Sequence, residues 1–201
     1  MKYQDVIVGS YQPKEIELNP TEMRFRIGKG VEHTGELFDA ALQKFYEAVD
    51  YKYVYVKNPV RVEGDLVDFG FAATKSRDLA GLLRDCREVF FMAVTAGIGV
   101  DRLVTRTQIM SKTESYFIDG IGSTAAESLA NRVNEDICRG LSVTRRFSPG
   151  YGDVELAFQI PLLERVRARD TIGILLSDSL LMTPLKSITA IIGILPEGEK
   201  A

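Results

Sequence analysis

A continuous apolar run at residues 89–95 constrains the fold more than any other feature of this chain. A strand whose side chains are apolar on both faces is typical of the buried centre of a sheet. Further β-rich runs lie at residues 51–56 and 187–193, and helical patterns occupy much of the chain between them. Strands gathered towards both ends with helices between them favour the α+β class, with a mixed, mostly antiparallel twisted sheet and several helices.

The other expected elements follow from periodicity, capping residues and chain breakers. In the N-terminal part we expect an edge strand at residues 6–8, a helix capped by Asn19, a helix after Thr34, a strand at 51–56 that Asn58 and Pro59 break, and strands at 60–62 and 66–71. Further helices are expected after the cap Ser76, at 101–110, at 154–158 after the cap Asp153, and from Pro161. Short strands are expected at 171–176 and 179–182.

Gly97-Ile98-Gly99 follows the apolar run and invites comparison with the glycine-rich turn that binds dinucleotides. The third glycine or alanine of that pattern is missing, and no strand–helix repeat precedes it. A tight strand-to-helix loop is therefore the better interpretation of these two glycines.

Composition narrows the classes of function. The formal net charge is −3, so nucleic-acid binding is not expected. The single histidine, His33, excludes a histidine-rich metal cluster, and Cys86 and Cys138 lie in apolar-periodic segments, which indicates buried free thiols in a reducing cytoplasm. Residues 172–195 are too polar to cross a membrane, and residues 1–20 have no signal-peptide pattern.

The stretch at residues 145–153 holds the residues best suited to binding a ligand. Pro149-Gly150 predicts the corners of a type II turn, because proline fixes φ and glycine accepts a positive φ. Such a turn places Arg146 and Tyr151 on the two sides of one bend, with a guanidinium suited to a carboxylate or phosphate and a ring suited to a base or a cation. Two interpretations stay open: a grip on a small ligand with an anionic and a planar end, or an ordinary surface turn with solvated arginines.

The longest helical signal covers residues 114–138, where small and apolar residues recur on one narrow stripe. Glu127 lies almost opposite Leu129 on this helix, on a face that we expect to be solvated. It would join a site only if the 145–153 loop folded back over that face, which Gly140 at the end of the helix makes geometrically easy.

Three segments resemble the activation domain of cobalamin-dependent methionine synthase. Arg146-Phe147-Ser148-Pro149-Gly150-Tyr151 is similar to the family's Arg-x-x-x-Gly-Tyr loop, which binds S-adenosylmethionine. Residues 176–184, followed by Ser187-Ile188-Thr189, are similar to the family's Leu-Thr-x-Ser-x-x-Met-x-Pro and Ser-Val-Ser pattern. Residues 125–130 are similar to the family helix whose glutamate faces the ligand. The matches fall in the family's order.

The resemblance implies one activation-domain-like domain over residues 1–201, with N-terminal helices and strands at 1–75 and a core with the ligand loop at 76–201. It implies S-adenosylmethionine as the ligand, bound by Arg146, Phe147, Ser148, Gly150, Tyr151 and Glu127. Arg146 would take the carboxylate, Tyr151 the adenosyl or sulfonium portion, and Glu127 the ammonium. The backbone at Phe147 and Ser148 would read the adenine edge. No residue is required as an acid, a base, a nucleophile or a metal ligand.

The implied function is the reductive reactivation of a corrinoid enzyme. The partner would be a cobalamin-binding methionine synthase or another corrinoid protein, which holds the cobalamin, and flavodoxin or another electron donor would supply one electron. The chain would then be a cytoplasmic subunit or activator of a methyltransferase in methionine biosynthesis, and not an enzyme by itself. Neither nucleic acid nor a membrane is an expected partner.

Departures from the family leave two further hypotheses open. Gly140 and Leu141 stand where the family has an acidic residue, and no tyrosine follows Tyr151. The alternative is therefore a module that docks on a corrinoid protein and no longer binds S-adenosylmethionine. A third hypothesis, an S-adenosylmethionine-dependent methyltransferase for a small molecule, is disfavoured because no glycine-rich fingerprint precedes an acidic strand end.

Overall fold

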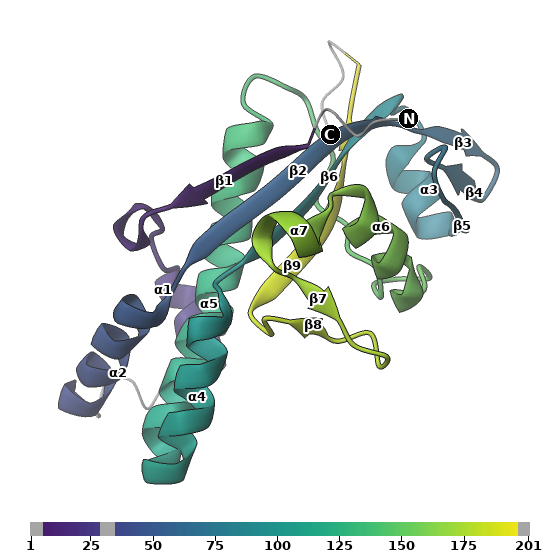
Figure 1. Cartoon of the computed structure of the whole chain (residues 1–201). Coiled ribbons are helices and arrows are strands. Elements are labelled where there is room, and N and C mark those ends of the chain that lie inside the picture. Colours follow the sequence, from purple (N-terminus) through teal and green to yellow (C-terminus); the bar gives the residue numbers. More distant parts are fainter. Residues whose placement is uncertain (1–5, 29–34, 197–201) are drawn as a thin grey trace.

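The computed structural model describes residues 6–28 and 35–196, which are built around a four-stranded antiparallel sheet (Figure 1). Its strands are β1 (Ile7–Tyr11), β2 (Tyr51–Pro59), β6 (Glu88–Thr95) and β9 (Ser187–Ile194), in the order β1-β2-β6-β9. β6 lies between β2, with Tyr53 opposite Val94, and β9, with Ala190 opposite Met92. The predicted central strand, the predicted edge strand and the α+β class are confirmed.

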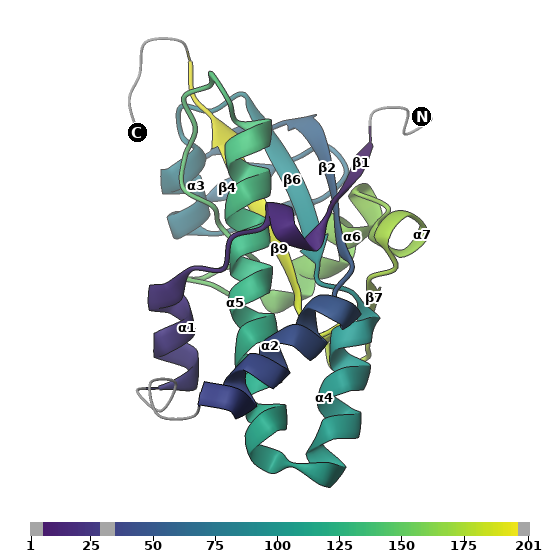
Figure 2. The same ribbon diagram turned by 90° about the vertical axis from the view of Figure 1, so that its left-hand side faces the viewer.

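β6 is apolar from Val89 to Val94 because both faces of the sheet are covered. Its alternating side chains enter two separate cores, with Phe90, Met92 and Val94 in one and Val89, Phe91 and Ala93 in the other. The first core lies under four helices, α1 (Pro20–Ile27), α2 (Gly35–Ala48), α4 (Ile98–Met110) and α5 (Lys112–Ile137). The second core lies under α3 (Arg77–Leu83), α6 (Gln159–Arg165) and α7 (Ala168–Ile172), as the two views show (Figures 1 and 2).

Two smaller sheets contribute side chains to the second core. A three-stranded sheet is made of β3 (Arg61–Glu63), β4 (Leu66–Asp68) and β5 (Ala73–Lys75), and a two-stranded hairpin of β7 (Leu175–Leu176) and β8 (Met182–Thr183). Two 3-10 turns, Pro13–Glu15 and Leu156–Phe158, lie in the connections. None of the helices in the described part of the chain combines the length and the apolarity that crossing a membrane requires.

Helix α5 runs along one face of the sheet and carries the predicted apolar stripe. Ser111 caps it, since the Ser111 Oγ accepts the Glu114 N–H at 3.2 Å. Ile118, Leu129 and Val133 are fully buried against the sheet and the neighbouring helices. After the helix, Gly140 adopts a φ of +79° and turns the chain back towards β9, which places the following loop beside α5.

The two glycines between β6 and α4 have a structural role, as the tight-loop interpretation predicted. Gly97 has a φ of +85° and precedes the first residue of α4. A Cβ on Gly99 would lie 2.2 Å from the carbonyl oxygen of Ala48, so glycine is needed for α4 to pack against the end of α2. The predicted helix caps Asn19 and Ser76 are also confirmed, because each side chain accepts backbone N–H groups of its helix.

The predicted break at Asn58 and Pro59 is wrong, because β2 continues through Pro59. The Val60 N–H donates to the Arg87 carbonyl at 2.9 Å, so the adjacent Pro59 nitrogen faces the other edge of β2. β1 pairs with β2 only as far as Tyr55, and the missing N–H therefore interrupts no ladder.

Asp153 does not cap a helix at residues 154–158, where only a 3-10 turn forms. It caps α3 instead: the Asp153 Oδ2 accepts the Arg77 N–H at 2.8 Å, and the Ser76 hydroxyl donates to the same carboxylate. These hydrogen bonds, led by the one from Ser76, lower the pKa of Asp153. The loop at 148–153 is thereby attached to a distant helix.

The C-terminal predictions need three further corrections. The expected strand at 179–182 is reduced to its last residue, because residues 178–180 turn the chain and β8 is Met182–Thr183. The expected strand at 171–176 is reduced to Leu175–Leu176, because Ile172 belongs to α7 and Gly173, with a φ of +75°, ends that helix. Short apolar runs of this length do not distinguish a strand from a buried helix turn. The helix expected from Pro161 is α6, which begins at Gln159, two residues earlier.

Candidate functional site

The turn at Ser148–Tyr151 has the predicted geometry. Gly150 adopts a φ of +88°, as the third position of a type II turn requires, and the Tyr151 N–H donates to the Ser148 carbonyl at 3.2 Å. A Cβ on Gly150 would lie 3.0 Å from a methyl carbon of Leu156. Both the backbone conformation and the available space therefore favour glycine at this corner.

The loop before the turn is bonded to the outer edge of β9. The Phe147 N–H donates to the Ile191 carbonyl at 2.9 Å, and the Ile191 N–H donates back to Phe147 at 2.7 Å. The Phe147 ring is buried in the second core, and the Ser148 hydroxyl donates to the Thr189 carbonyl at 2.6 Å. The two backbone groups of Phe147 are thus already paired, so this residue fixes the loop to the sheet.

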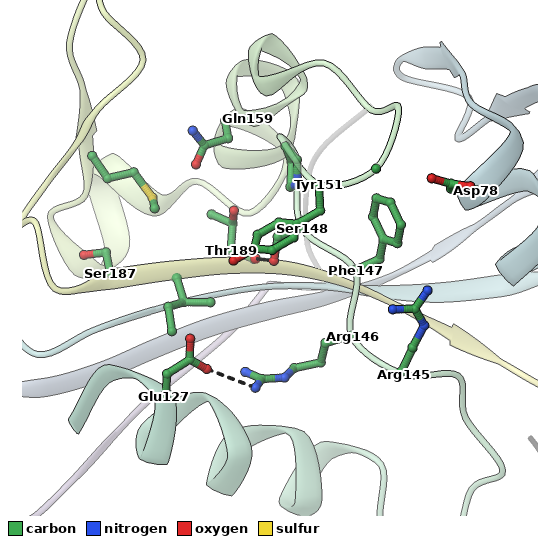
Figure 3. Close-up of a pocket in the computed structure, with 14 residues that line it drawn as sticks. Asp78, Glu127, Arg145, Arg146, Phe147, Ser148, Tyr151, Gln159, Ser187 and Thr189 are labelled. Atoms are coloured by element: carbon green, nitrogen blue, oxygen red, sulfur yellow. Dashed lines mark hydrogen bonds and ion pairs between the residues drawn. The ribbon is translucent and has the colours of Figure 1, made fainter. Parts of the chain in front are cut away.

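Arg146 points away from the sheet edge towards α5 (Figure 3). Its Nη2 donates to the Glu127 Oε2 at 3.3 Å and to the Asn131 Oδ1 at 2.8 Å. The side chain of Arg146 is 22 % exposed and that of Glu127 is 37 % exposed. The loop therefore folds back over the outer face of the helix, and the expectation that Glu127 is merely solvated is wrong.

A hollow of about 630 Å³ lies between α5, the loop and the start of β9. The 145–149 segment, Tyr151 and Gly152 form one wall, Glu127 another, and Ser187, Ile188 and Thr189 the floor along the sheet edge. Gln159 closes the side opposite Glu127, and Asp78 lies near the far end (Figure 3). Met182 also lines the hollow. A volume of this size is typical of sites for small organic ligands, which run from about 300 to 1,000 Å³.

The structure brings together five of the six predicted site residues on the wall of this hollow, namely Glu127, Arg146, Phe147, Ser148 and Tyr151. Gly150 shapes the turn between them without lining the hollow. The Tyr151 ring is 70 % exposed at the rim, where a ligand or another protein can cover it. His33 lies outside the described residues.

Several lining residues were not predicted as site residues. Gln159 and Asp78 carry no motif in the sequence, whereas Met182 is the methionine of the segment at residues 176–184 that resembles the family pattern. Ser187 and Thr189 belong to a segment that matched the family pattern, which was the available signal for the floor of the hollow. Asn131 is four residues after Glu127, so helical spacing alone places the two on one face.

The electrostatics of the hollow suit binding better than acid–base or nucleophilic chemistry. Arg146 Nη1 is buried and has no hydrogen-bond partner among the described residues, so the guanidinium has spare donor capacity. Cysteine does not line the hollow, and burial raises the pKa of the Cys138 thiol to about 11, which keeps that thiol protonated at neutral pH. Among the described residues no group of three or more histidine, cysteine, aspartate or glutamate side chains is placed to hold a metal ion.

The α+β fold of this chain resembles that of a solved reactivation domain. The structural likeness is to a crystal structure of the MetH reactivation domain bound to AdoHcy, with 16 % sequence identity and a TM-score of 0.70 over 98 % of this chain and 80 % of that one. No family model matches the sequence. A search of curated proteins finds no match either. The activation-domain-like fold predicted from the three motif segments is confirmed by this likeness.

Proposed function

We propose that this protein binds S-adenosylmethionine in the hollow between α5 and β9 and serves in the reductive reactivation of a corrinoid methyltransferase. The observation that carries the proposal is the meeting of Arg146 with Glu127, 19 residues apart in the chain, on the wall of a hollow that Tyr151 borders. The binding of AdoHcy by a solved domain of the same fold supports the same class of ligand.

The chemistry of the hollow matches the two charged ends of such a ligand. A guanidinium donates to a carboxylate through strong charge-assisted hydrogen bonds, and Arg146 has a donor nitrogen without a partner among the described residues. Glu127 would balance the ligand ammonium. The exposed face of Tyr151 would attract the sulfonium or the adenosyl ring. These residues hold and orient the methyl donor, which is the contribution a protein makes when another centre supplies the chemistry.

Apolar side chains around the hollow fit a second role, docking on a partner. Tyr151, Leu156 and Leu181 are 70 %, 40 % and 60 % exposed. Gln159, which lines the hollow, donates a hydrogen bond to the carbonyl of Leu180, the residue before Leu181. Exposed apolar groups at the rim of a polar hollow often mark an interaction site. We propose that a cobalamin-binding methionine synthase or another corrinoid protein covers this rim. Its cobalt would accept the methyl group after flavodoxin or another donor had supplied one electron.

Calorimetry with S-adenosylmethionine and with AdoHcy tests the proposed ligand. Wild-type protein is expected to bind both, and Arg146→Ala is expected to weaken binding by roughly 10- to 100-fold, because hydrogen bonds to a charged group contribute about 1.5–3 kcal/mol. Arg102→Ala, on the exposed side of α4, is the matched control and should bind as the wild type does. Equal affinities for the two variants would overturn the site assignment.

The docking module without ligand remains the alternative function. The paired backbone groups of Phe147 favour it, because they are already bonded to Ile191 where an adenine edge was expected. No heat at millimolar S-adenosylmethionine, together with a stable complex between the wild-type chain and a purified corrinoid protein, would select this alternative.

A further inference from the structure

A neutral side chain holds Arg146 more closely than its carboxylate partner does. The Arg146 Nη2 lies 2.8 Å from the Asn131 Oδ1 and 3.3 Å from the Glu127 Oε2. Asn131 and Glu127 are four residues apart on α5, so they present their side chains on one face at successive turns. The shorter of the two hydrogen bonds is therefore made to an amide, which has no net charge.

An amide acceptor orients a guanidinium without neutralising it. The carboxylate of Glu127 makes one long contact with Arg146 and is more than one-third exposed, so water screens much of its attraction. The positive charge of Arg146 consequently stays available to an incoming anion. A second carboxylate in place of Asn131 would give the three side chains a net charge of about −1 and would repel a ligand carboxylate.

Asn131 belongs to the back of the site and not to its wall. It lines a second hollow, together with Glu17, Asn19 and Ser128, and does not line the hollow that Tyr151 borders. An effect of Asn131 on a ligand would therefore pass through Arg146. It should be specific to the end of the ligand that Arg146 contacts.

We infer that Asn131 is a positioning residue that holds the guanidinium of Arg146 towards the hollow and preserves its charge for the anionic end of the ligand. The inference rests on the proposed function and deepens it, because it names the residue that makes the site prefer adenosyl compounds with an amino-acid carboxylate over those without one. Asn131 itself need not contact the ligand.

Two variants of Asn131 and two ligands test this inference. AdoHcy has the amino-acid end, whereas 5′-methylthioadenosine lacks it. Asn131→Asp is expected to weaken AdoHcy binding by roughly 10- to 100-fold through the added charge, and to leave methylthioadenosine binding within about twofold. Asn131→Leu removes the hydrogen bond without adding charge and should weaken AdoHcy binding by roughly tenfold.

Ionic strength separates the charge effect from a general loss of structure. The Debye length falls from roughly 20 Å at about 20 mM salt to roughly 4 Å at about 500 mM, so the difference between Asn131→Asp and Asn131→Leu should shrink over that range. Asn134→Asp is the matched control, because it adds the same charge to α5 and its side chain accepts a hydrogen bond from Cys138 instead of Arg146. Thermal melting of each variant checks that it is folded.

Each outcome has a defined meaning. Loss of AdoHcy binding in Asn131→Asp, with methylthioadenosine binding retained, supports the inference. Equal losses for the two ligands, or an effect no larger than that of Asn134→Asp, would overturn it and leave the proposed ligand standing. Failure of the wild type to bind either ligand would overturn the proposed function, and the inference with it.

Discussion

Deletion of a single hydroxyl oxygen is predicted to have opposite effects at two tyrosines in this protein. Tyr51 is 1 % exposed, and its hydroxyl is buried without a hydrogen-bond partner among the described residues. Tyr11 donates from its hydroxyl to the Asp136 Oδ2 at 2.6 Å, which attaches the edge strand β1 to helix α5. Burial, followed by the bond to Asp136, raises the pKa of Tyr11, so the phenol remains a donor at neutral pH.

The magnitudes follow from the hydrogen bonds. An unsatisfied buried hydroxyl costs about 1–3 kcal/mol. Its removal in Tyr51→Phe leaves a void of roughly 15 Å³, which at about 24 cal/mol per Å³ costs about 0.4 kcal/mol. Tyr51→Phe should therefore be neutral or more stable by up to about 2 kcal/mol. Tyr11→Phe loses a bond to a charged group, but Arg132 and Arg139 still pair with Asp136, so a loss of about 1–2 kcal/mol is expected.

Thermal unfolding followed by circular dichroism measures both variants under identical conditions. For a chain of this length about 1 kcal/mol shifts Tm by roughly 2–4 °C, so a gap of about 1–4 kcal/mol should make Tyr51→Phe melt roughly 2–16 °C above Tyr11→Phe. Urea titrations with an unchanged m-value would show that the native state, and not the denatured ensemble, has changed. A Tyr51→Phe variant that is less stable than the wild type by more than about 1 kcal/mol would refute the reasoning, because the phenol would then have a partner such as buried water.

Two other changes have expected outcomes. Gly99→Ala should destabilise the protein by about 1–3 kcal/mol, because its Cβ would meet the Ala48 carbonyl at 2.2 Å. Gly81→Ala, on the open side of α3, should instead stabilise the protein by about 0.5–1 kcal/mol. Urea titration of both variants measures the difference, and equal effects would contradict the close approach of α4 and α2. Asp153→Asn should lower Tm at pH 7. Because the pKa of Asp153 is lowered on folding, its stabilisation is present above the unfolded value of about 3.9 and is lost as pH falls through the folded value. The gap in Tm between variant and wild type should therefore close in acid, and a gap independent of pH would refute the role of the charge.

The sequence by itself determined those features whose physical cause is local. Six consecutive apolar residues, Val89 to Val94, can be satisfied only where both faces of a strand are covered, and β6 lies between two cores. The caps Asn19 and Ser76 bond to N–H groups two or three residues away, so their neighbours in the chain suffice to identify them. The Pro149-Gly150 turn likewise depends on the φ preferences of its own residues.

Only the tertiary structure decided which distant groups meet. The capping rule suggested a local helix for Asp153, but its carboxylate bonds to Arg77, 76 residues away, because the loop folds back across α3. A helical wheel places Glu127 on the face away from the core, yet it cannot show that a loop 19 residues later covers that face and supplies Arg146. Binding of a ligand by Arg146 and Glu127 is a prediction that calorimetry tests. Local patterns identify suitable side chains, and folding brings them to one hollow through long-range packing that no short stretch of sequence contains.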